Sequence, residues 1–105
     1  MNHSQAFTEI MNHLHEQIRA EENSKQGLSV SFLMRWMRDQ RAAIMDLRDT
    51  KDPFWRAFLE ILDRNLMEQD KIFSWSFESQ DEEIATATKA KVKLIKDLQK
   101  LQKIV

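Results

Sequence analysis

Hydrophobic residues recur along most of the chain at spacings of three and four, which is the repeat of an amphipathic α-helix. In the first such stretch they share one face, formed by Phe7, Ile10, Met11, Leu14 and Ile18. Ser4 precedes this face and is expected to be its N-cap, since the hydroxyl can accept a hydrogen bond from a free backbone N–H. The polar run that follows contains Gly27, the only glycine, and glycine commonly ends a helix. We therefore predict a first helix over residues 4–24.

A second helix is predicted over residues 30–48, with Ser29 or Ser31 as its N-cap. Its central apolar positions are Leu33, Met37, Ile44 and Leu47, and Trp36 lies beside them. The apolar arc extends from Phe32 at one edge to Met45 at the other, which is roughly 220° at 100° per residue. Because this arc is wide, we expect the helix to have neighbours on two sides.

The third stretch begins at Asp52 and Pro53. This pair favours a helix start, because the Asp side chain caps free N–H groups and a proline at the first helical position leaves no N–H unpaired. The main apolar stripe consists of Phe54, Phe58, Ile61, Leu62 and Ile72, and a second stripe along one edge consists of Trp55, Leu59, Leu66 and Phe73. Together they cover roughly 200°, about twice the arc that one helix of a four-helix bundle requires. We predict a helix over residues 53–74.

Residues 73–77 alternate between aromatic and serine positions. We interpret them as a frayed helix end or an extended link, because a single short strand would have nothing to pair with. Ser79 and Glu82 then match the capping box, in which each side chain accepts a hydrogen bond from a free backbone N–H. The apolar face beyond them consists of Ile84, Leu94, Ile95, Leu98, Leu101 and Val105. We predict a fourth helix over residues 80–104.

The composition supports a folded, helical protein. Hydrophobic residues make up 42% of the 105-residue chain and charged residues 31%, which is the balance of a globular domain. One glycine and one proline leave few positions for the tight turns of a β-rich fold. We predict an all-α, compact bundle of about four helices that forms a single domain over residues 1–105.

The residue types needed for catalysis or metal binding are scarce. There is no cysteine, and neither a Gly-rich phosphate loop nor a Gly-flanked serine is present. His13 and His15 point about 200° apart on a helix and cannot bind one ion together. We therefore expect no catalytic residue, no cofactor and no metal site, and a protein that is not an enzyme. The polar N-terminus and the lack of an apolar run of about 18 residues predict a cytoplasmic protein that does not enter the membrane.

Charge is distributed unevenly along the chain. The formal net charge is −1, but residues 89–105 hold six lysines and one aspartate, or +5, which leaves −6 for residues 1–88. One line along the fourth predicted helix contains Lys89, Lys93, Lys96, Lys100 and Lys103. A lysine stripe opposite an apolar stripe is typical of a solvated outer face. The alternative is a stripe that binds nucleic acid or an acidic partner.

The surplus apolar surface of the third predicted helix favours burial against another chain, since aromatic anchors are enriched in protein interfaces. The residues predicted to bind a partner are Trp55, Leu59, Leu66, Phe73, Trp75 and Phe77. The alternative is a compact bundle in which this helix is central and buries both stripes within its own chain. We expect a small protein–protein interaction module of the adaptor, chaperone, inhibitor or immunity type that binds a protein partner and self-associates as a homodimer.

Overall fold

The computed structural model describes residues 3–73 and 77–103, and within these ranges all regular structure is helical. The elements are α1 (His3–Glu22), α2 (Val30–Leu47), α3 (Pro53–Phe73) and α4 (Gln80–Gln99), followed by a short 3₁₀ helix, η1 (Lys100–Lys103). The prediction of an all-α bundle of four helices is confirmed. No described helix is long and apolar enough to cross a membrane.

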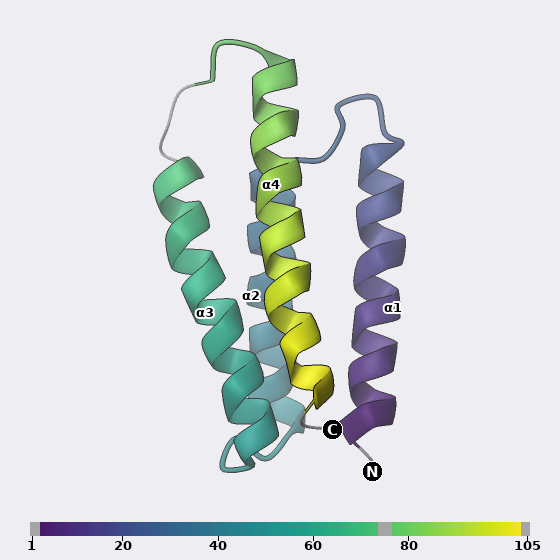
Figure 1. The fold of residues 1–105 in the computed structure, drawn as a ribbon, viewed down its shortest axis with the longest axis vertical. Helices are drawn as coiled ribbons and strands as arrows, with labels where there is room; N and C mark the ends of the chain where they lie inside the picture. The colour runs from purple at the N-terminus through teal and green to yellow at the C-terminus, as the bar shows by residue number, and fades with distance from the viewer. Residues whose placement is uncertain (1–2, 74–76, 104–105) are drawn as a thin grey trace.

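The four helices alternate in direction along the chain, so that α1 and α3 run one way and α2 and α4 the other (Figure 1). In that view α4 lies in front of α2, with α1 and α3 on opposite sides of the pair. The backbone of α2 approaches those of both α3 and α4 closely, and the small buried residues Ala87 and Ala90 of α4 permit close packing. The backbone of α1 lies farther from its neighbours. Large side chains such as Phe7 and Leu14 therefore fill the space between α1 and the rest of the bundle.

The core draws on all four helices in the way that the apolar stripes predicted. Its fully buried side chains include Phe7, Leu14, Leu33, Met37, Phe58, Leu62, Leu94 and Leu98. Trp36 is also buried, in agreement with its predicted place on α2. The prediction for Leu47 is wrong, because this side chain is 77% exposed. Leu47 is the last residue of α2, where the chain leaves the bundle for the turn into α3.

Three of the predicted helix starts are capped by the expected side chains. Ser29 Oγ accepts a hydrogen bond from Phe32 N at 3.1 Å, and Asp52 Oδ1 accepts one from Phe54 N at 2.8 Å. Ser79 Oγ accepts one from Glu82 N at 3.1 Å. The reciprocal half of the capping box differs from the prediction, since the Glu82 carboxylate accepts from Glu78 N rather than from Ser79 N.

α1 ends at Glu22, close to the predicted end, but the two capping predictions for this helix are wrong in detail. Ser4 is not the N-cap, because α1 already includes His3 and Ser4 lies within its first turn. The His3 ring stacks on Phe54 of α3 with the ring centroids 4.7 Å apart. Gly27 lies five residues beyond the end of α1 and does not terminate it. Its φ of 77° places it in the left-handed region that favours glycine.

Aromatic side chains hold the first turns of α1 and α3 together. His3 Nε2 lies 2.8 Å from Asp52 Oδ2, and Phe7 packs edge-on against both Phe54 and Phe58. Because Asp52 also caps α3, one carboxylate both starts this helix and anchors the beginning of α1. Residues 49 positions apart in sequence thus meet at the same end of the bundle.

Candidate binding groove between α3 and α4

A groove with a volume of about 280 Å³ lies between the C-terminal half of α3 and α4. Its lining combines apolar, amide and charged side chains, namely Asn65, Glu68, Gln69, Ile72, Thr86, Lys89, Ala90 and Lys93. Ligand sites usually have this character, with a largely apolar wall and a few polar groups that set orientation. The volume is slightly below the range for such sites, which is roughly 300–1,000 Å³.

Gln69 is the most unusual residue in the groove. It is only 2% exposed, and neither Oε1 nor Nε2 has a hydrogen-bond partner among the described residues. More than about 90% of buried polar groups in folded proteins are paired, because an unpaired one loses its hydration without compensation. Gln69 therefore places an uncompensated donor and an uncompensated acceptor beside the groove.

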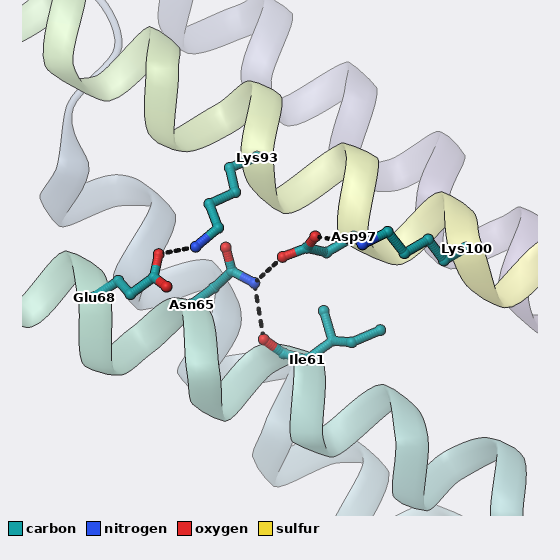
Figure 2. Close-up of polar contacts among 6 residues, drawn as sticks. All are labelled: Ile61, Asn65, Glu68, Lys93, Asp97 and Lys100. Atoms are coloured by element: carbon teal, nitrogen blue, oxygen red, sulfur yellow. Dashed lines mark hydrogen bonds and ion pairs between the residues drawn. The ribbon is translucent and has the colours of Figure 1, made fainter.

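Asn65 lies one turn before Gln69 and is equally buried, but its amide nitrogen is satisfied (Figure 2). Asn65 Nδ2 donates to Ile61 O at 2.9 Å and to Asp97 Oδ2 at 3.1 Å, which links α3 to α4. Asp97 also lies 3.5 Å from Lys100 Nζ through its other oxygen. Both amide protons of Asn65 are thus used. Its Oδ1 points away from Asp97, toward the side where Lys93 lies.

Lysines form the rim of the groove on the α4 side. Lys93 makes an ion pair with Glu68 across the two helices (Figure 2), and both side chains are about half exposed. Lys89 is also exposed at the rim. Exposed pairs such as Lys93 with Glu68 contribute little to stability, so a ligand can displace this contact at small cost.

A second, shallower hollow of about 390 Å³ adjoins the groove on the outer face of α4. It is lined by Thr88, Lys89, Val92, Lys93 and Lys96, so the two hollows share Lys89 and Lys93. Val92 in this lining is 56% exposed. An apolar side chain is therefore surrounded by lysines on this face.

The predicted lysine stripe lies on the exposed side of α4 and η1, with all five of its members classed as exposed. Two of the five, Lys93 and Lys100, pair with Glu68 and Asp97. Lys91 lies outside the stripe and pairs with Glu22 of α1, with 2.7 Å between Nζ and Oε2. Part of the positive charge of α4 is thus balanced by acidic groups of the same chain.

Among the described side chains that were predicted to bind a partner, one is buried and three are partly buried. Trp55 is only 4% exposed and packs against Phe54 and Phe58 within its own chain. The alternative of burial within the bundle therefore holds for Trp55. Leu59, Leu66 and Phe77 are partly buried, and both leucines pack against the core. The side chain of Phe73 and all of Trp75 lie outside the described residues.

Other candidate sites have less support. A larger hollow, of about 660 Å³, lies beside the loop between α1 and α2, and Glu21, Lys25, Arg35 and Glu83 line it with both signs of charge. None of its lining residues has a buried, unpaired side-chain atom in the part of the chain that the structure describes. The buried Trp36 Nε1 is unpaired but borders none of the three hollows.

Residues that could bind a metal do not cluster. Over residues 3–73 and 77–103, no three His, Asp or Glu side chains are placed to share an ion. His13 and His15 are exposed on α1.

The position of the groove was not predicted from the sequence, although the sequence contains a signal for it. Asn65 and Gln69 are polar residues in the register of the main apolar stripe, since they lie between Ile61 and Ile72 at steps of three and four. Polar residues at core-facing positions are expected to be paired or functional. Comparison with known proteins adds no further candidate, because no family model, curated protein or solved structure matches this chain.

Proposed function

We propose that the protein is a non-enzymatic protein–protein interaction module that binds its partner with the face formed by the α3–α4 groove and the outer hollow of α4. The observation that carries the proposal is the continuity of these two hollows through Lys89 and Lys93. A groove that leads onto a shallow face with an exposed apolar side chain can receive a segment of a partner and contact the surface around it. Interfaces have this anatomy, with apolar contacts at the centre and polar groups around them.

The same face favours a protein partner over nucleic acid. Val92 contributes apolar surface that phosphate groups would not use, and the groove contains the acidic Glu68. A nucleic-acid site would instead require a continuous cationic surface. The remaining reason to consider nucleic acid is the exposed stripe of five lysines. Salt dependence separates the two classes, since phosphate contacts weaken steeply between about 50 and 200 mM salt.

Self-association is a separate part of the proposal and rests on α3. Met67 of α3 is 66% exposed, so an outer edge of this helix still presents apolar surface outside the core. A two-fold axis would allow the edge to cover its own copy, which is the simplest closed arrangement. Met67 is not among the residues that line the α3–α4 groove.

Site-specific photo-crosslinking in cells of the native host tests the proposal. A photoreactive residue at Val92 lies in the proposed face, and one at Gln5 on α1 is an exposed control away from it. We expect a discrete protein adduct from position 92 that survives nuclease treatment, and none from position 5. Equal labelling at the two positions, or an adduct that nuclease removes, would contradict the proposal.

A further inference from the structure

The unpaired Gln69 amide indicates what kind of group the groove receives. Oε1 can accept two hydrogen bonds and Nε2 can donate two, and neither has a partner among the described residues. We infer that the groove binds an extended, acidic peptide segment of the partner, whose main chain pairs with the Gln69 amide. This inference rests on the proposed function, because it names the part of the partner that enters the groove.

The geometry of an extended chain matches a side-chain amide. In an extended segment, the N–H and C=O of one residue point to the same edge. Gln69 Oε1 can therefore accept from that N–H while Nε2 donates to that C=O. A helical segment cannot do this, because its N–H and C=O groups are already paired along its own axis.

The spacing of the two groove amides fits the same ligand. Asn65 and Gln69 are four residues apart on α3, which is about 6 Å along a helix axis. Residues two apart in an extended chain are about 6.6 Å apart and present the same edge. A segment that lies along α3 can thus pair the N–H and C=O of one residue with the Gln69 amide. The N–H of the residue two positions along then lies near Asn65 Oδ1, which takes no part in the bonds to Ile61 and Asp97.

The rim determines the charge of the segment. Lys89, Lys93 and Lys96 lie beside the groove and across the adjoining hollow, where carboxylates of the bound segment can reach them. Glu68 is the acidic residue at this rim and already holds Lys93, so an incoming carboxylate must share or replace that contact. The groove volume of about 280 Å³ suits a few residues rather than a folded element.

Access to Gln69 requires a small local rearrangement. Both polar atoms of the amide are closed to solvent although the residue lines the groove. The rim side chains Lys89 and Lys93 are long and flexible, and we infer that they move aside when the segment enters. Binding then supplies the hydrogen bonds that the amide lacks in the free protein.

Nuclear magnetic resonance with defined peptides tests this inference. The probe is the peptide acetyl-Glu-Ala-Glu-amide. The control peptide has the same sequence but carries N-methyl groups on the main chain, so it lacks the main-chain N–H donors. We expect the Gln69 side-chain resonances to shift in a saturable way with the first peptide, and binding to weaken about tenfold with the second, the loss expected for two hydrogen bonds. Acetyl-Gln-Ala-Gln-amide should bind more weakly than the acidic peptide, with the difference decreasing at high salt.

Protein variants complete the test. Gln69→Met keeps the length of the side chain but removes the amide, and we expect it to weaken binding of the acidic peptide about tenfold. Gln5→Met on the exposed side of α1 is the matched control and should bind like the wild type. The inference is overturned if the Gln69 resonances do not move, or if Gln69→Met, shown by circular dichroism to be folded, binds the peptide unchanged.

The same variants separate this inference from the proposed function. If the photoreactive residue at Val92 still captures a protein partner when Gln69 is replaced by Met, with the adduct undiminished, main-chain capture is wrong and the interaction face stands. If no adduct forms at Val92 in the wild type, the interaction face itself is wrong. Loss of the adduct on Gln69→Met, with Gln5→Met unaffected, supports both.

Discussion

Replacing Gln69 with Met is expected to stabilise the protein, although most substitutions of buried residues destabilise. Methionine has a similar length and a similar helix propensity, and it has no polar group that needs a partner. Asn65→Leu is the contrasting change, one turn earlier on the same helix. Both wild-type residues are 2% exposed, but only Asn65 has hydrogen-bond partners. Burial is therefore matched, and hydrogen bonding is the difference.

The magnitude follows from the cost of an unpaired buried polar group, which is about 1–3 kcal/mol. Removing the Gln69 amide should raise the free energy of unfolding by about this amount. Asn65→Leu should lower it by about 1–3 kcal/mol, because it removes two hydrogen bonds and leaves Asp97 without its donor on α3. For a domain of this size, each kcal/mol corresponds to about 4–8 °C in Tm.

Urea unfolding followed by far-UV circular dichroism measures both changes. A change of about 1–3 kcal/mol in the free energy of unfolding moves the urea midpoint by about 1 M if the m-value stays constant. Gln5→Met on the exposed side of α1 should stay within about 0.5 kcal/mol of the wild type. A Gln69→Met protein less stable than the wild type would refute the reasoning, because the amide would then be satisfied in the folded protein, for example by bound water. Equal effects of Gln69→Met and Asn65→Leu would refute it as well.

Three further outcomes are expected. Gly27→Ala should lower stability by about 1–2 kcal/mol, since φ is 77° and an added Cβ would lie 2.7 Å from Ile84 Cδ1; an unchanged urea midpoint would contradict this. Phe58→Ala should cost about 3–5 kcal/mol, because the ring is fully buried, and a smaller loss in calorimetry would mean that the core collapses around the gap. Met67→Asp should reduce self-association in light scattering without changing the circular dichroism spectrum, because the side chain is exposed; a wild-type protein that remains monomeric at high concentration would exclude the dimer.

The helices and most of their caps could be predicted because their determinants are local. Ser29, Asp52 and Ser79 bond to backbone groups two or three residues away, so the sequence around each start contains the information. The apolar repeat within each helix likewise identified most of the core. The prediction at Ser4 was wrong, since α1 already includes His3, whose side chain contacts Asp52, 49 residues away in the sequence.

The position of the groove could not be predicted from the sequence, because it depends on how the helices pack against one another. Asn65 and Gln69 lie in the register of the main apolar stripe, but the stripe alone does not show what packs against them. Their burial follows from the approach of α4 to α3, which also brings Asp97 to Asn65 across 32 residues. The same packing buried Trp55 inside the chain, where the apolar arc alone had suggested a partner. Periodicity and capping act over one or two turns of a helix and were therefore determined by the sequence itself. Only the packing of distant segments in the bundle decided the partners of Asn65, the lack of partners at Gln69 and the burial of Trp55.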